Sequence, residues 1–152
     1  MKICIITGSR AEFDLLKNLI IKINKDKFFN LKLIVTGAHL KKFFGKTLNY
    51  IKGQKLKINK IVDLSIKGDN VSSISNSFST GIKKFSSLLY EIKPDAIMIL
   101  GDRYEIFSSA ISACLNRIPI IHLHGGERTE GLIDEAIRHS ITKLSHIHLV
   151  ST

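Results

Sequence analysis

Continuous apolar runs alternate with segments of helical periodicity along this chain of 152 residues. Runs without polar interruption indicate strands buried on both faces, as in parallel sheets, whereas half-exposed antiparallel strands alternate apolar and polar residues. The predicted strands are residues 3–7, 31–36, 58–64, 96–100, 118–123 and 147–150.

Between these runs, apolar residues recur every three or four positions, which is the spacing of amphipathic helices. The predicted helices are residues 11–24, 71–92, 104–116 and 134–145, with a shorter helix expected at 40–52. Because right-handed crossovers place helices on both faces of a sheet, the alternation predicts an α/β fold with a Rossmann-like, doubly wound parallel sheet. The length fits one domain, so we expect residues 1–152 to form a single domain.

Ligands of such sheets bind beyond the carboxyl ends of the strands, so the strand-to-helix loops are the candidate site. The first of them holds Gly8, Ser9 and Arg10. Gly8 permits a tight turn, the following helix offers backbone N–H groups to an anion, and Arg10 can add a bidentate contact. The loop lacks the glycines of a dinucleotide fingerprint and the ending of a Walker loop. The alternative is a capped helix start with a surface arginine.

The strand at residues 96–100 is followed by Gly101, Asp102 and Arg103. A carboxylate at the mouth of a buried sheet is suited to general-base chemistry. Asp is also a favoured helix cap, so the sequence leaves open whether Asp102 acts on a ligand or caps the helix at 104–116.

A third loop combines acidic, basic and glycine residues in the segment 122–139. Glu127 and Asp134 bracket Gly131, and Arg138 lies one helical turn beyond Asp134. Several carboxylates on one sheet edge provide the acid and base pair that proton transfer needs. The alternative for Asp134 and Glu135 is capping together with ordinary i,i+4 pairing to Arg138 and His139.

Two histidine pairs, at 122 and 124 and at 146 and 148, have the alternate spacing of strand metal ligands. Neither pair has a nearby cysteine or a third ligand of clear geometry, so we expect no metal. We instead expect His122 and His124, which lead into the glycine turn, to line the site. Gly125 and Gly126 then let the backbone approach a ligand.

Net charge changes the picture little. Residues 1–93 hold 18 Lys or Arg against 6 Asp or Glu, and residues 94–152 hold 5 against 7, which gives +10 in total. The scattered lysines lack interleaved aromatics and indicate a solvated face, so no nucleic-acid partner is expected. Four of the five arginines lie near the predicted loops, which suggests recognition of a carboxylate or phosphate: Arg10, Arg103, Arg128 and Arg138.

Cys4 and Cys114 lie in apolar runs and are expected to be buried free thiols. Two such residues fit a reducing cytoplasm rather than a disulfide framework. No apolar run approaches the length of a membrane span, and the N-terminal run is too short for a signal peptide, so we expect no membrane association.

Three motifs together resemble one family: TGSRAEFDLL, GDRYEIFSSA and IPIIHLHGGERTEGLIDEAIRHSITKLSHIHL. They look like the hydrolysing UDP-N-acetylglucosamine 2-epimerases of bacterial sialic acid biosynthesis. The resemblance implies the N-terminal half of a two-domain, glycosyltransferase-B-like fold with its active site between the halves. The C-terminal domain of that family is absent from these 152 residues, and the chain stops directly after a predicted strand, which suggests truncation.

The resemblance implies loss of the C2 proton of the sugar, departure of UDP to give a 2-acetamidoglucal, and addition of water to give N-acetylmannosamine. Asp102 and Asp134 match acidic positions tied to catalysis, and Arg10 matches an arginine implicated in nucleotide binding. His124 occupies a position where other branches carry a catalytic glutamate, so either Glu127 or His124 takes that role, with Glu127 placed first. A UDP-sugar substrate, a homodimer and no cofactor are implied.

Three other functions remain open from the sequence. The same motifs would serve a 2-epimerase of UDP-2,4-diacetamido-2,4,6-trideoxyglucose. A second possibility is the acceptor half of a glycosyltransferase of similar architecture. The third is a non-catalytic module that binds a nucleotide sugar or a partner.

Overall fold

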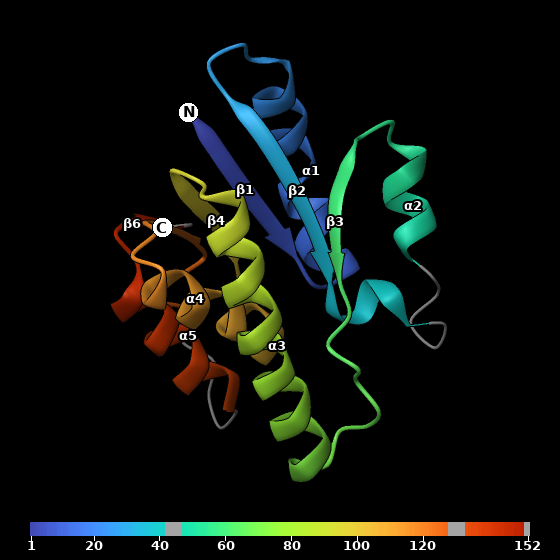
Figure 1. Ribbon diagram of the computed structural model, residues 1–152, viewed down its shortest axis with the longest axis vertical. Coiled ribbons are helices and arrows are strands. Elements are labelled where there is room, and N and C mark those ends of the chain that lie inside the picture. Colours follow the sequence, from blue (N-terminus) through green and yellow to red (C-terminus); the bar gives the residue numbers. More distant parts are fainter. Residues whose placement is uncertain (42–46, 128–132, 151–152) are drawn as a thin grey trace.

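The computed structural model describes residues 1–41, 47–127 and 133–150. Six parallel strands form one sheet in the order β3-β2-β1-β4-β5-β6 (Figure 1). Sequence order reverses between β1 and β4, which makes their carboxyl ends the switch point of the sheet. The strands are β1 (Lys2–Thr7), β2 (Asn30–Thr36), β3 (Ile58–Val62), β4 (Ala96–Leu100), β5 (Ile120–Leu123) and β6 (Ile147–Leu149).

Helices cover both faces of the sheet, which confirms the predicted doubly wound fold. Alternate residues of β1 point to opposite faces, so Cys4 and Ile6 pack with α3, α4 and α5, while Ile3 and Ile5 pack with α1 and α2. The helices are α1 (Arg10–Lys25), α2 (Thr47–Gly53), α3 (Val71–Ile92), α4 (Tyr104–Leu115) and α5 (Ile133–Leu144).

The expected helix at 40–52 takes a different form. A 3₁₀ turn, η1 (Gly37–Leu40), follows β2 directly, and α2 begins only at Thr47. Residues 42–46, between them, lie outside the described part of the chain.

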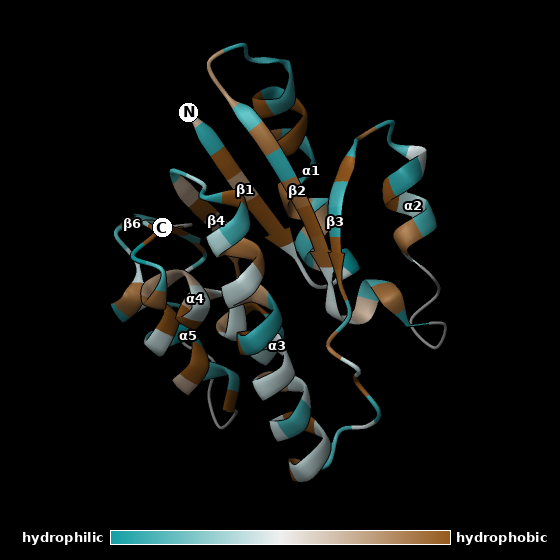
Figure 2. Ribbon diagram, in the orientation of Figure 1, coloured by the Kyte–Doolittle hydropathy of each residue, from teal (hydrophilic) through white to brown (hydrophobic). Residues whose placement is uncertain are grey.

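Burial on both faces is confirmed for the central strands and wrong for the two edges. Every residue of β4 is buried, whereas all three residues of β6 are exposed and β3 is exposed at Lys60 and Ile61. Figure 2 shows the apolar colour concentrated on the inner strands. An edge strand has only one neighbour, and no described helix covers β6 fully, so its apolar residues remain at the surface.

One cysteine prediction is also wrong. Cys4 is buried in β1 as expected, but Cys114 is exposed near the end of α4. The apolar run around Cys114 forms an amphipathic helix, and position 114 falls on its outer face. Neither thiol forms a disulfide.

Candidate active site at the carboxyl edge of the sheet

The first loop is organised by a carboxylate that the sequence analysis did not single out. The backbone N–H of Gly8 donates to Glu12 Oε2 at 2.7 Å, and the Ser9 hydroxyl donates to Oε1 at 3.0 Å. The N–H of Glu12 donates back to Ser9 Oγ at 3.4 Å. This is a variant of the capping box in which Glu12 accepts from the N–H of Gly8, one residue before the N-cap Ser9, and the Ser-x-x-Glu spacing was the signal that could have revealed it. Part of the expected anion cradle therefore already binds the chain's own carboxylate.

Glu12 is only 5% exposed. Desolvation by burial raises its pKa from the ordinary value of 4.5 to about 7, although the hydrogen bonds from Gly8 and Ser9 oppose the rise. A second buried carboxylate, Glu105, adds to the rise by its charge. This loop therefore contains a carboxyl group that titrates near neutral pH.

Among the described residues, Arg10 makes no contact with Asp102, Glu127 or Asp134 at the carboxyl edge of the sheet. Its guanidinium lies 3.5 Å from Asp14 on the same helix and 5.0 Å from the ring centroid of Tyr50. The side chain is 63% exposed. It is thus a solvent-facing group at the rim, as the surface-arginine alternative stated.

Arg103 pairs with Glu105, two residues further along, at 3.3 Å. Glu105 is 1% exposed, so the guanidinium supplies the counter-charge of a buried carboxylate. Arg103, and not Asp102, occupies the N-cap of α4, and it makes no side-chain capping bond. The capping alternative for Asp102 is therefore wrong.

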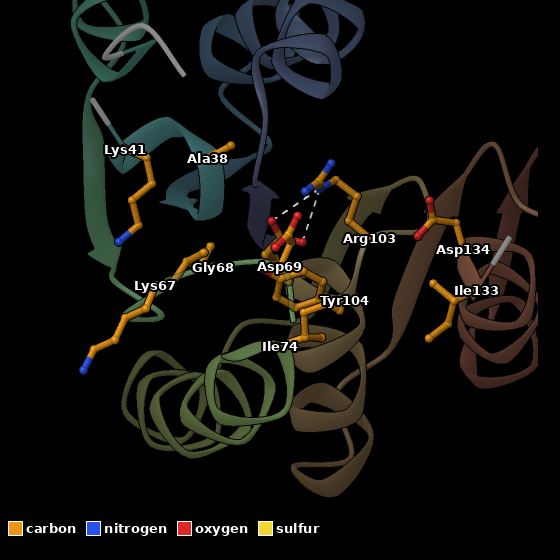
Figure 3. Close-up of a pocket in the computed structure, with 12 residues that line it drawn as sticks. Ala38, Lys41, Lys67, Gly68, Asp69, Ile74, Arg103, Tyr104, Ile133 and Asp134 are labelled. Carbon is orange, nitrogen blue, oxygen red and sulfur yellow. Dashed lines mark hydrogen bonds and ion pairs between the residues drawn. The ribbon is translucent and has the colours of Figure 1, made fainter. Parts of the chain in front are cut away.

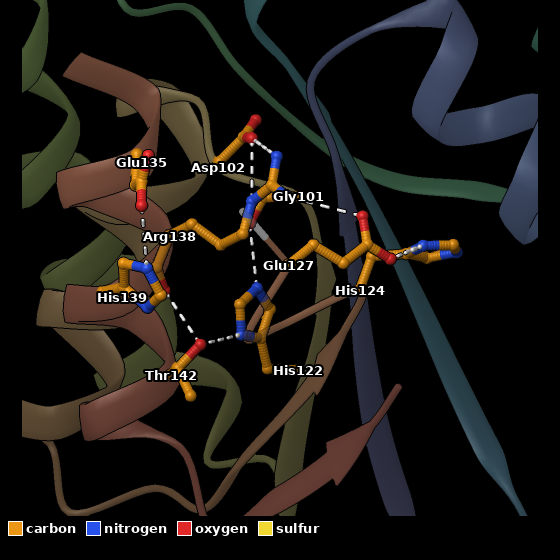
Figure 4. A network of polar contacts seen from close by, with 9 residues as sticks. All are labelled: Gly101, Asp102, His122, His124, Glu127, Glu135, Arg138, His139 and Thr142. Atoms are coloured by element: carbon orange, nitrogen blue, oxygen red, sulfur yellow. Dashed lines mark hydrogen bonds and ion pairs between the residues drawn. The ribbon is translucent and has the colours of Figure 1, made fainter. Parts of the chain in front are cut away.

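Asp102 instead joins a network centred on Arg138 (Figure 4). The Nε and Nη2 groups of Arg138 both donate to Asp102 Oδ2, the former at 3.0 Å. Its third nitrogen, Nη1, donates to Glu127 Oε2 at 3.4 Å. Arg138 is 11% exposed, so one nearly buried guanidinium ties the loop after β4 to the loop after β5.

His124 extends this network outward. Its Nδ1 lies 2.8 Å from Glu127 Oε1, so the two oxygens of Glu127 face His124 and Arg138 respectively. The His124 and Glu127 side chains are 38% and 37% exposed, which leaves this end of the network open to a ligand. The sequence placed Asp102, Glu127, His124 and Arg138 on one edge, and the structure brings them into contact.

The expectation that His122 lines the site is wrong, because its ring is buried and holds neighbouring segments together. His122 is fully buried, its Nε2 lies 2.8 Å from the carbonyl oxygen of Gly101, and its Nδ1 lies 3.3 Å from Thr142 Oγ1. Burial lowers the pKa of His122, although its hydrogen bond to Gly101 acts in the opposite direction.

Among the described residues, no cluster of three or more metal-ligating side chains is present. His146 also serves the backbone, since its Nδ1 accepts the N–H of Ile120 at 3.3 Å.

Asp134 lies apart from Arg138 and lines a cavity of about 570 Å³ (Figure 3). Ile66, Ile74 and Tyr104 form the apolar wall of this cavity, and Arg103 lies on the same side of the cavity as Asp134.

The i,i+4 pairing that the sequence suggested for the start of α5 is confirmed for Glu135 and His139, which are 3.4 Å apart. It is wrong for Arg138, which is engaged by Asp102 and Glu127. Arg128 and Gly131, which the sequence analysis also singled out, lie outside the described residues.

A second buried histidine lies under the first loop. His39 is fully buried between Thr7 Oγ1, at 3.1 Å from its Nε2, and Thr47 Oγ1, at 2.8 Å from its Nδ1. Desolvation lowers its pKa from the ordinary value of 6.5 to about 4, so it is neutral at physiological pH. Its backbone N–H donates to the carbonyl of Gly8, which fixes the second loop to the first.

The profile of UDP-N-acetylglucosamine 2-epimerases matches residues 21–152. The chain belongs to this family. It is 46% identical over 150 residues to a Campylobacter jejuni protein described as GDP/UDP-N,N'-diacetylbacillosamine 2-epimerase (hydrolyzing), covering 99% of this chain and 39% of that protein. It is 38% identical over 150 residues to a UDP-N-acetylglucosamine 2-epimerase of Neisseria meningitidis, with the same coverage.

Solved structures of the family share the fold. A UDP-GlcNAc 2-epimerase from Neisseria meningitidis, crystallised with UDP-GlcNAc, superimposes with a TM-score of 0.83 at 25% identity, over 99% of this chain and 40% of that one. The chain therefore spans about two fifths of the length of these family members, and it matches the N-terminal half of their glycosyltransferase-B-like fold. No described helix of this family member is long and apolar enough to cross a bilayer.

Proposed function

We propose that this chain forms the N-terminal half of a hydrolysing UDP-N-acetylglucosamine 2-epimerase. The observation that carries the proposal is the Arg138 network, which joins Asp102, after β4 at the switch point of the sheet, to Glu127 and His124, after the neighbouring strand β5. Ligands of open α/β sheets bind at this point. Relatives of the chain are named for epimerisation of a nucleotide sugar, which is a proton-transfer reaction.

The proposed reaction proceeds in two stages. A base removes the C2 proton, the C–H electron pair forms the C1–C2 double bond, and the C1–O bond breaks so that UDP leaves with its oxygen. Water then adds across the double bond of the 2-acetamidoglucal, with hydroxyl at C1 and a proton at C2, to give N-acetylmannosamine. Transfer of protons on two faces of the ring requires separately placed groups. Asp102, Asp134 and the His124–Glu127 pair supply these groups in the proposal.

Other residues of the edge contact the substrate in this proposal. Gly8, Ser9 and Arg10 lie at the loop after β1, and Arg103 lies beside the cavity that holds Asp134. Gly125 and Gly126 allow close approach of backbone to the sugar, and Arg138 orients the carboxylates. The C-terminal half of the fold would contribute the facing wall and the remaining contacts to UDP.

The test compares the activity of the 152-residue chain with that of the longest natural form of the protein that contains it. Both are incubated with UDP-N-acetylglucosamine, and UDP, glucal and N-acetylmannosamine are quantified. We expect turnover by the longer form only, and loss of glucal formation in Asp102→Asn. Sustained turnover by the 152-residue chain would contradict the need for a second half. Transfer of the sugar to an acceptor without glucal would favour a glycosyltransferase, and binding without either product would favour a non-catalytic module.

A second substrate has specific support. The Campylobacter relative, at 46% identity, is named for a diacetamido sugar, and the cavity beside Asp134 has apolar wall at Ile66 and Ile74. Such a wall suits the methyl groups of a 2,4-diacetamido-2,4,6-trideoxy sugar. Comparing kcat/KM for the two UDP-sugars separates them, since an extra buried methyl group discriminates by about 10–200-fold.

Assembly and location form part of the proposal. We propose a cytoplasmic homodimer, which fits the free thiols of Cys4 and Cys114. Sedimentation of the longest natural form would show a mass of two chains. A mass of one chain across the accessible concentration range would contradict the dimer.

A further inference from the structure

The segment 124–126, after β5, has an unusual backbone. His124 adopts a φ of 57°, in the left-handed region that favours glycine, and Gly126 follows with a φ of 75°. A non-glycine residue in this region is strained, and such strain concentrates at functional sites. Between them, a Cβ on Gly125 would lie 2.7 Å from His122 Nδ1, so the backbone is packed directly against a buried ring. The packing holds His124 in its strained position.

Backbone strain alone does not identify the role of His124. The contacts of its imidazole ring indicate that role. His124 Nδ1 faces Glu127 Oε1 at 2.8 Å. A carboxylate oxygen accepts hydrogen bonds, so Nδ1 carries the proton in this pair. A neutral imidazole has one N–H, and its other nitrogen then has a free lone pair. The contact therefore places the lone pair on Nε2, at the partly exposed end of the network.

The carboxylate of Glu127 is committed on both sides. Oε1 accepts from His124, and Oε2 accepts from Arg138 at 3.4 Å. Arg138 in turn donates twice to Asp102 Oδ2. Glu127 is thus held between two donors, in the manner of a carboxylate that orients a histidine base and stabilises the imidazolium it becomes.

We infer that His124 Nε2 removes the C2 proton of the substrate and that Glu127 is a positioning residue which fixes the histidine tautomer. The inference rests on the proposed function and reverses the order expected from the family resemblance, which placed Glu127 ahead of His124. In the elimination step, the proton moves to Nε2, the C–H electron pair forms the C1–C2 double bond, and UDP departs with the C1–O electrons. The resulting imidazolium lies against the Glu127 carboxylate.

The tautomer can be measured without any turnover. In the longest natural form, ¹⁵N spectra of the histidines at alkaline pH, where imidazoles are neutral, should show His124 protonated at Nδ1. His122, whose Nε2 faces a carbonyl oxygen, should be protonated at Nε2 and serves as the internal reference. Glu127→Ala should convert His124 to the Nε2–H tautomer and leave His122 unchanged. The matched control is Glu135→Ala, which removes the partner of His139 and should not affect His124.

Finding His124 protonated at Nε2 in the unaltered protein would overturn the inference. So would an unchanged tautomer in Glu127→Ala. A variant that fails to fold would lose the His122 signal as well, and Glu127→Gln, whose amide oxygen can still accept from Nδ1, then supplies the comparison by retaining the Nδ1–H form.

Proton transfer is tested by deuterium incorporation at C2 of the UDP-sugar or product in D₂O. Asn tolerates the left-handed backbone at position 124, and we expect His124→Asn to slow incorporation by about 10²–10⁴-fold. Glu127→Gln should slow it less. The reverse order would make Glu127 the base and overturn the inference. If the unaltered protein neither exchanges nor releases UDP, the proposed function fails, while the tautomer measurement still reports on the dyad.

Discussion

Arg138 is the side chain through which the acidic residues of the site are held together. It provides counter-charge to two carboxylates from different loops while being 11% exposed itself. Asp102 is itself only 19% exposed, and Arg138 is the arginine that contacts it in the described part of the chain. Removing one partner from such a network costs more than the net contribution of the pair, because the remaining charge stays desolvated.

We therefore expect Arg138→Gln to lower the free energy of unfolding by about 1–3 kcal/mol, a range reduced for the partial exposure of both carboxylates. Arg10→Gln is the matched control, because it also removes an arginine from an ion pair but at 63% exposure. It should change the free energy by less than about 0.5 kcal/mol. Urea denaturation at neutral pH measures both. Equal effects would show that the network contributes nothing beyond a surface pair.

Glu12 and His39 have pKa values shifted in opposite directions beneath the same loop. Glu12 titrates at about 7 in the folded chain against 4.5, so between these values the folded state binds more protons and stability falls as pH rises. His39 titrates at about 4 against 6.5, so between those values the unfolded state binds more protons and stability rises with pH. The two contributions oppose each other between pH 4.5 and 6.5.

Single substitutions should expose each slope. Between pH 4.5 and 6.5, the free energy of unfolding of Glu12→Gln should rise by about 1–3 kcal/mol relative to that of the unaltered chain, because the variant lacks the fall caused by Glu12. That of His39→Gln should fall by a similar amount, because the variant lacks the rise caused by His39. Urea denaturation at three pH values in this window gives both differences. The same slope in all three proteins would contradict the assignment of these pKa shifts.

These residues show where sequence reasoning about the site reached its limit. Asp102, Glu127, His124 and Arg138 could be placed on one edge, because parallel strands bring their carboxyl ends together. Their pairing could not be predicted, since Arg138 has acidic neighbours on its own helix and contacts two distant loops instead. Glu12 was missed because its burial depends on tertiary packing, which brings Arg103 and Glu105 at the start of α4 close to the first loop, although its capping-box spacing was visible.

At the scale of elements, α3 and α4 make close helix contact through a glycine. A Cβ on Gly81 would lie 2.5 Å from Ser108 Oγ and 2.8 Å from Ser108 Cβ. No helical residue other than glycine allows this approach without a shift of one helix. Figure 1 shows the two helices lying side by side over one face of the sheet.

Gly81→Ala should lower the free energy of unfolding by about 1–3 kcal/mol, the usual cost of overpacking. Gly53→Ala, at the end of α2, is the control, since a Cβ there meets no atom within 4 Å. It should be neutral or slightly stabilising, because alanine favours helix. Thermal denaturation followed by circular dichroism distinguishes the two, and an unchanged midpoint for Gly81→Ala would mean that the helices separate at little cost.

The four longer helices and the inner strands were predictable to within a few residues because local periodicity determines them. Residues 71–92 form α3 as expected, with Asn70 as its cap. The edges were not predictable in the same way. An apolar run such as 147–150 looks the same whether or not a layer covers it, and only the strand order shows that β6 has one neighbour.

For the whole molecule, β6 is an apolar edge. Ile147 and Leu149 are 51% and 45% exposed on this strand, which has one free side in the described sheet, and Val150, directly after it, is 58% exposed. Unpaired edge strands of this kind promote association between chains.

The isolated 152-residue chain should therefore self-associate at high concentration, and Leu149→Lys should reduce this association without lowering the midpoint of thermal unfolding. Light scattering across a concentration series measures the effect. Ile61→Lys, on the opposite edge strand β3, is the matched control at 48% exposure. Equal reductions by both variants would attribute the association to general surface charge rather than to β6.

The Arg138 network also has a consequence for inhibitor design. One guanidinium already neutralises part of two carboxylates, so an added phosphate or carboxylate group would have to displace Asp102 or Glu127 to reach it. A compound with positive charge on a ring nitrogen would instead meet the acceptor-rich side of the network. Iminosugars should therefore bind this edge more tightly than neutral sugar analogues of the same size, and their affinity should weaken as salt concentration rises.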